Sequence, residues 1–108
     1  MIEKKLSSGK KILIRELSID KMDELKDMLE IVFSGEQKVL KNMSKTRTAW
    51  VRAGLGGIVD GWKTKNGAIP PDAVLKQFND EDMNEISEAV QEAQRLYFKK
   101  KSNYVLMY

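Results

Sequence analysis

Residues 79–97 read NDEDMNEISEAVQEAQRLY, and this stretch predicts the longest helix of the chain. Asn79 is a favourable N-cap, and the acidic residues after it suit the positive end of a helix dipole. Apolar residues then recur at steps of three and four, which places them in one stripe along a helix. The stripe consists of Met83, Ile86, Val90, Ala93 and Tyr97. We therefore expect this helix to pack on the rest of the domain along that stripe.

Upstream, residues 46–62 read TRTAWVRAGLGGIVDGW and contain three glycines within four positions. A phosphate-binding loop places its glycines before a helix, where free N–H groups attract the anion. Here Gly54, Gly56 and Gly57 follow a segment that predicts a helix, and glycine readily ends a helix. The stretch therefore predicts a helix end, followed by a loop over residues 58–69, and argues against a nucleotide site.

Two further helices are predicted before these glycines. Ser18 is a candidate cap for the first one, in which apolar residues repeat with helical spacing over residues 22–33. Ser34 and Gln37 have the spacing of a capping box. That spacing predicts that one helix ends there and that a second begins at Gly35, although the polar residues near its middle could break or bend it.

The second predicted helix carries a basic face. Residues 38–65 contain seven Lys or Arg and one acid, whereas the net charge of the whole chain is only +3. At about 100° per residue, four of the cations gather opposite the apolar stripe of this helix. They are Lys38, Lys41, Lys45 and Arg52. Such a face is a candidate contact for a polyanion or a protein partner, although a solvated face is the commoner explanation.

The first residues of the chain predict a β-hairpin, because two short β-prone runs flank SSGK, in which Gly9 suits a tight turn. Pro71 then suits the start of a short helix ahead of the final one. The sequence thus predicts a mainly α protein in which an N-terminal β-hairpin packs on a three- to four-helix domain. Its single domain, 1–108, would comprise a hairpin (1–17), a helical part (18–101) and a candidate flexible tail, strand or partner-binding segment (102–108).

Composition removes most catalytic templates. The 108 residues include no cysteine and no histidine, which excludes thiolate chemistry, most zinc and iron sites and the commonest general base near neutral pH. The acidic run around Asp80 and Glu81 lacks the spacing of a calcium-binding loop. We therefore expect no enzyme activity, no catalytic residue, no cofactor and no metal. The apolar runs are too short to cross a bilayer or to form a secretion signal, so we expect an intracellular protein without a membrane partner.

The segment GKKILIRELSIDKMDELKDML, residues 9–29, resembles the N-terminus of tail assembly chaperones of long-tailed bacteriophages. The glycine stretch at residues 46–62 and DAVLKQFNDEDMNEISEAV at residues 72–90 are similar to phage morphogenesis proteins of this kind. The resemblance implies a non-enzymatic protein of the host cytoplasm that keeps the tape measure protein soluble until the tail tube forms. It assigns no contact residues. Four apolar residues are conceivable contacts, namely Met22, Met28, Leu40 and Met43.

Genes of such chaperones often give a longer product by ribosomal slippage, and FKKKS at residues 98–102 can be encoded by a slippery run of nucleotides. A basic helix end explains the same residues without slippage. Self-association is a further expectation. Two other classes of function stay open: a small phage-encoded inhibitor that docks on a host defence protein by charge, and a nucleic-acid-binding protein that uses the basic face.

Overall fold

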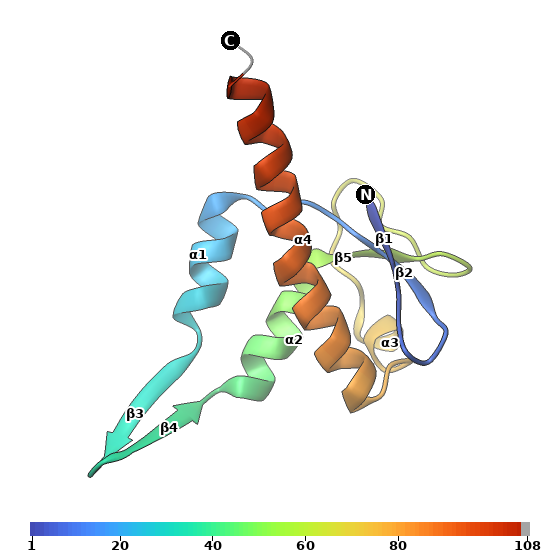
Figure 1. Ribbon diagram of the computed structural model, residues 1–108. Helices are drawn as coiled ribbons and strands as arrows, with labels where there is room; N and C mark the ends of the chain where they lie inside the picture. The colour runs from blue at the N-terminus through green and yellow to red at the C-terminus, as the bar shows by residue number, and fades with distance from the viewer. Residues whose placement is uncertain (107–108) are drawn as a thin grey trace.

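The computed structural model describes the backbone of residues 1–106 and, except at residues 30–34 and 100–106, their side chains. This part of the chain contains four helices and five strands, which are interspersed along the sequence (Figure 1). The fold is therefore mixed α/β. The predicted N-terminal hairpin is confirmed and the number of helices agrees with the three to four predicted, whereas the description of the protein as mainly α needs correction because of strands that the sequence did not predict.

Three strands form one antiparallel sheet. β1 (Ile2–Lys5) and β2 (Lys11–Ile14) are the two strands of the predicted hairpin. β5 (Leu55–Ile58) pairs with the other edge of β2 and gives the order β1-β2-β5. Two of the glycines that were predicted to end a helix, Gly56 and Gly57, therefore lie within a strand.

Two helices pack together and share one core with this sheet. They are α2 (Met43–Gly54) and α4 (Asp80–Leu106). The predicted stripe of α4 is confirmed, because its first four residues are buried and Tyr97 packs against the core. Most of the large apolar residues with at most 1% of their surface exposed come from the strands and from these two helices, and Leu25 joins them from residues 19–27: Ile12, Ile14, Leu25, Val51, Leu55, Ile86 and Val90.

The other two helices are short. α1 (Ile19–Asp27) begins after Ser18, whose hydroxyl accepts the N–H of Lys21 at 3.1 Å, as predicted for the cap. α3 (Asp72–Leu75) follows Pro71 and makes a single turn. A loop links β5 to α3, broadly as predicted for residues 58–69, and it includes a tight turn in which Gly67 has φ of 73° and the N–H of Ala68 donates to the carbonyl of Lys65 at 3.0 Å.

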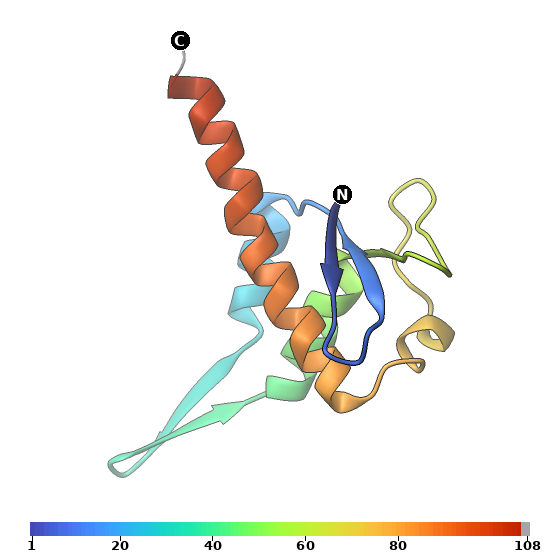
Figure 2. The same cartoon turned by 45° about the vertical axis from the view of Figure 1, so that its right-hand side comes forward.

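A second hairpin, here called the arm, occupies residues 30–41 and projects away from the body of the protein (Figures 1 and 2). It consists of β3 (Glu30–Ser34) and β4 (Gln37–Lys41). The helices predicted over this region are wrong. Ser34 pairs with Gln37 across a tight turn and caps no helix, and Gly35 has φ of 63°, in the left-handed region. The second helix begins only at Met43.

The last helix is longer than predicted. The backbone of α4 is helical to Leu106 and so includes residues 102–106 of the predicted tail. The last two positions of that tail, 107 and 108, lie outside the described residues. Within residues 1–106, no helix combines the length and the apolar character that a bilayer crossing requires.

Candidate partner-binding groove

The four cations that were predicted to share one helix face lie on two different elements. Lys38 and Lys41 belong to β4, whereas Lys45 and Arg52 belong to α2. The predicted basic helix face is therefore wrong, because the first part of that helix is a strand. Only Lys45 and Arg52 come together, since both line a groove beside α2.

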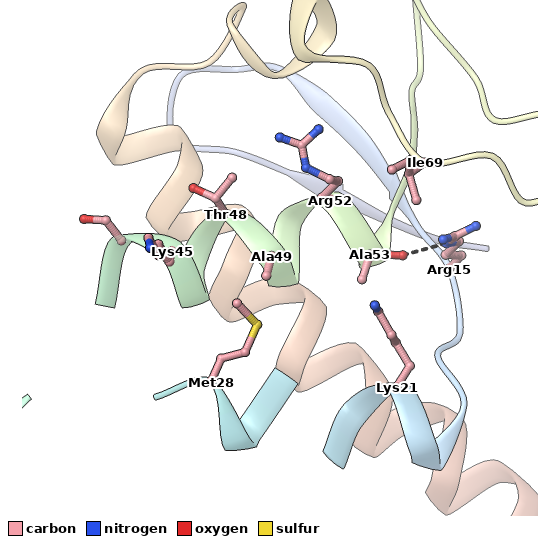
Figure 3. Close-up of a pocket in the computed structure, with 10 residues that line it drawn as sticks. Arg15, Lys21, Met28, Lys45, Thr48, Ala49, Arg52, Ala53 and Ile69 are labelled. Atoms are coloured by element: carbon pink, nitrogen blue, oxygen red, sulfur yellow. Dashed lines mark hydrogen bonds between the residues drawn. The ribbon is translucent and has the colours of Figure 1, made fainter. Parts of the chain in front are cut away.

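This groove lies between α1 and α2 and has a volume of about 540 Å³ (Figure 3). Its apolar surface comes from Met28 after α1, from Ala49 and Ala53 on α2, and from Ile69 in the loop before α3. The two alanines are four residues apart on the helix and leave space because their side chains are short. Ile69 is 57% exposed, although it is a large apolar residue. A groove of this size falls within the range of about 300 to 1,000 Å³ typical of ligand pockets.

Basic side chains surround the apolar surface. Among the described residues that line the groove, four carry a positive charge and none carries a carboxylate. The four are Arg15, Lys21, Lys45 and Arg52. They come from three separate parts of the chain, which the fold brings together around the groove (Figure 3). The groove is therefore electrostatically suited to an acidic occupant.

Arg15 holds one end of the groove in place. Its Nε donates to the carbonyl of Ala53 at 2.6 Å, and its Nη1 donates to the carbonyl of Gly67 at 2.7 Å. The first bond satisfies a carbonyl in the last turn of α2, which has no partner within the helix. Arg15 thus joins the end of β2, the end of α2 and the loop before α3, and its role in the groove is chiefly structural.

The other three cations differ in whether they already form an ion pair within the protein. Arg52 Nη1 forms an ion pair with Asp72 Oδ1 at 2.9 Å, and Lys21 Nζ lies 3.4 Å from Glu24 Oε1 on the same helix. Exposed pairs of this kind contribute only about 0 to 1 kcal/mol, so an incoming carboxylate can replace them. Lys45 is exposed and forms no ion pair with any residue of the described part of the chain. It is the cation most available to a partner.

A second hollow of about 600 Å³ lies between α2 and α4, but its lining is mixed in charge. There Arg47 Nη1 donates to Asn84 Oδ1 at 3.2 Å, and Arg47 Nη2 lies 3.5 Å from Asp80 Oδ1. The Nε of the same arginine is buried and has no hydrogen-bond partner among the described residues. Trp50 also lines this hollow, but it is only 4% exposed, so it packs inside and has no free face on which a base could stack.

The carboxyl groups of Asp82 and Glu85 have shifted pKa values, and their hydrogen bonds stabilise the fold. Burial alone would raise the pKa of Asp82, but hydrogen bonds from Ser8, from the backbone of Asn79 and from Lys10 outweigh it and lower that pKa. Hydrogen bonds from the side chain and backbone of Ser7 lower the pKa of Glu85. Both groups therefore stay charged near neutral pH, where a general base or acid would need a raised pKa. In the described part of the chain, no three metal-binding side chains gather at one place.

Sequence reasoning identified only part of this groove. Of the four apolar residues considered as conceivable contacts, Met28 lines the groove, Met43 lines the second hollow and Leu40 lies on the arm. Met22 packs against the core. The contributions of Arg15 and Ile69 depend on how distant segments meet and have no local signal. The short side chains at positions 49 and 53 are the local feature of the sequence that indicates a groove along this side of α2.

Comparisons of the chain with protein-family models, with curated proteins and with solved structures give no match.

Proposed function

We propose that this protein is a non-enzymatic tail assembly chaperone of the host cytoplasm, which binds amphipathic helices of the tape measure protein in the groove between α1 and α2. The observation that supports the proposal best is the groove, in which an apolar surface is bordered by cations. An amphipathic helix binds such a groove by burying its apolar face, while its acidic residues meet the surrounding positive charges. The sequence resemblance supplies the identity of the partner.

The expected affinity is moderate, which suits a chaperone that must release its partner. Each large apolar side chain that a partner buries contributes about 1.5 to 3 kcal/mol before the cost of association is subtracted. A groove that accepts a few such side chains is consistent with a dissociation constant of about 1 μM, or about −8 kcal/mol. Binding through several similar helices of one partner would raise the overall affinity further.

The test uses the tape measure protein that the resemblance predicts to be encoded near this gene, expressed alone and together with the chaperone. We expect the tape measure protein to be soluble and to copurify only when the chaperone is present. Ala49→Glu should abolish this effect, because it places a carboxylate on the apolar surface of the groove. Ala73→Glu is the matched control, since it makes the same change at an exposed position of a different helix, α3.

Charge is tested separately with Lys45→Glu. We expect this variant to weaken binding of the tape measure protein about fivefold at low salt, which corresponds to about 1 kcal/mol, and to lose the difference as salt rises. Lys76→Glu provides the same charge change on an exposed residue outside the groove. A tape measure protein that stays insoluble with the wild-type chaperone, or that binds Ala49→Glu as well as wild type, would contradict the proposal.

A further inference from the structure

The arm forms a two-stranded sheet that is separate from the sheet of β1, β2 and β5. Both views of the molecule show it pointing away from the body (Figures 1 and 2). On β4, Val39 is 42% exposed and Leu40 is 41% exposed, so apolar side chains of the arm face solvent. An isolated two-stranded hairpin is at best marginally stable in water. The arm would therefore be stabilised by the addition of further strands.

The two edges of the arm differ in their chemistry. β4 carries Lys38 and Lys41, and lysine on an edge strand discourages pairing with another strand. β3 reads EIVFS, with three consecutive apolar residues that favour strands and with neither lysine nor proline. In the described structure β3 pairs with β4 alone, so its other edge is open. The edge of β3 is the one suited to receive a strand.

The sequence of β3 is also complementary to itself. Antiparallel pairing about a two-fold axis at Val32 sets position 31 opposite position 33 of the second copy, and position 30 opposite position 34. Ile31 then meets Phe33, Val32 meets its own copy, and Glu30 meets Ser34. Apolar pairs therefore occupy the centre of the interface, and no like charges stand directly opposite each other.

This pairing closes on itself. Two arms joined through β3 give the strand order β4-β3-β3-β4, in which the lysines of β4 lie on both outer edges. A two-fold interface of this kind uses the same surface on both copies and leaves no unused half to recruit a third. The outer lysines oppose further growth of the sheet. We propose that this protein forms a dimer through the β3 edges of two arms, which build one antiparallel four-stranded sheet.

The proposal is tested by sedimentation equilibrium of the full chain over a wide range of concentrations. Wild-type protein should follow a monomer–dimer equilibrium. Val32→Lys should weaken dimerisation about tenfold or more, because it removes the central apolar pair and sets two lysines opposite each other across the axis.

Val39→Lys is the control. Val39 pairs with Val32 within the arm, so both substitutions remove a valine from the same cross-strand pair and cost the arm similar stability. In the dimer, however, the two copies of residue 39 lie about 14 Å apart, since three strand spacings separate them. That distance exceeds the screening length of about 8 Å at physiological ionic strength, so Val39→Lys should weaken the dimer much less.

A mixture provides the decisive measurement. Val32→Lys and Val32→Glu should each be impaired alone but should associate when combined, because opposite charges then face each other at the axis. Wild-type protein that is monomeric at every concentration would overturn the proposal. Equal impairment of Val32→Lys and Val39→Lys would also overturn it, and so would failure of the mixture to associate, since either result would place the contact away from the β3 edge.

Discussion

Gly54 is needed for space and not for an unusual backbone conformation. It is the last residue of α2, and its φ is not positive, unlike that of Gly35 or Gly67. A Cβ atom at this position would lie 2.3 Å from Val90 Cγ1 and 2.6 Å from Val90 Cγ2. Val90 is fully buried and has no free space into which to move. The residue that ends α2 therefore also sets how closely α2 and α4 pack.

Gly54→Ala is accordingly expected to destabilise the protein by about 1 to 3 kcal/mol, as overpacking of a core does. This loss should occur although alanine favours a helix interior by about 1 kcal/mol over glycine. Urea denaturation monitored by circular dichroism measures it.

Gly61→Ala is the control for Gly54→Ala, because its Cβ would lie 3.5 Å from the nearest atom, Ile58 Cβ, which is an ordinary contact. The free energy of unfolding of this variant should change little. If Gly54→Ala proved as stable as wild type, the close packing of α2 on α4 would not be a constraint on position 54.

At the scale of elements, α4 could be predicted from sequence because independent local signals agree. Asn79 Oδ1 accepts the N–H of Asp82 at 2.7 Å, as its N-cap role requires, and the apolar stripe of the helix is buried. Asp82 Oδ2 in turn lies 3.4 Å from the backbone N of Asn79, which completes a reciprocal cap. When cap, charge order and periodicity all indicate one helix, little depends on the rest of the fold.

The arm could not be predicted in this way, because its signals conflict. Its short apolar runs are compatible with both helical and strand spacing, and such runs cannot be assigned from periodicity alone. Ser34 and Gln37 are three positions apart in a capping box and equally so across a two-residue hairpin turn. Gly35 adopts the left-handed conformation that the turn needs. A glycine in the sequence allows this conformation but does not require it. Because Lys38 and Lys41 lie on the arm, this one error also divided the predicted basic face.

Gln94 shows how α4 fixes a segment far away in the chain. It is only 6% exposed, and its side chain binds the backbone between β2 and α1 at two points. Its Oε1 accepts the N–H of Leu17 at 2.8 Å, and its Nε2 donates to the carbonyl of Arg15 at 3.0 Å. This side-chain amide thus provides hydrogen-bond partners for two backbone groups that lie between the sheet and α1 and belong to neither.

Gln94→Leu is expected to lower the free energy of unfolding by about 2 to 4 kcal/mol, because it leaves both backbone groups without a partner. Hydrogen exchange should also accelerate specifically at the Leu17 amide. A general loss of packing would instead accelerate exchange at many amides. Gln91→Leu, at an exposed position of the same helix, is the matched control and should have a much smaller effect, because it loses only the 3.3 Å bond from Gln91 Nε2 to Ser87 Oγ and no bond to the backbone. Unchanged exchange at Leu17 in the Gln94 variant would contradict the role assigned to the amide.

At the scale of the whole molecule, the tip of the N-terminal hairpin is bound to the first turns of α4. The backbone N–H of Ser7 donates to Glu85 Oε2 at 3.0 Å, and the Ser7 hydroxyl donates to the other oxygen of the same carboxylate. Lys10 Nζ lies 3.3 Å from Asp82 Oδ2, and the same ammonium lies 5.3 Å from the centroid of the Phe78 ring. These contacts join two ends of the fold through a pair of carboxylates.

Stability should therefore fall in acid. The pKa values of Asp82 and Glu85 are lower in the folded protein than their ordinary values of 3.8 and 4.5, so the unfolded chain takes up protons first as the pH falls. Their contribution is complete near neutral pH and is lost progressively below about pH 5. Urea denaturation across this range measures the slope.

The double variant Asp82→Asn with Glu85→Gln is expected to be less stable than wild type at neutral pH and to depend less on pH below 5, as both charges are removed. Glu81→Gln, at an exposed position beside Asp82, should leave the slope close to that of wild type. A double variant with the wild-type slope would show that other carboxyl groups cause the acid sensitivity.

The attachment of the hairpin to α4 has a consequence for synthesis. Ser7 and Glu85 are separated by 78 positions, and Leu17 and Gln94 by 77, so the first strands leave the ribosome long before their support is translated. Hydrogen bonds that close so large a loop form late and slowly, because the chain loses conformational entropy on closing the loop before the new contacts stabilise it. The nascent chain consequently carries an incomplete, partly uncovered sheet until α4 emerges, and throughout that interval the open edges of its strands favour aggregation.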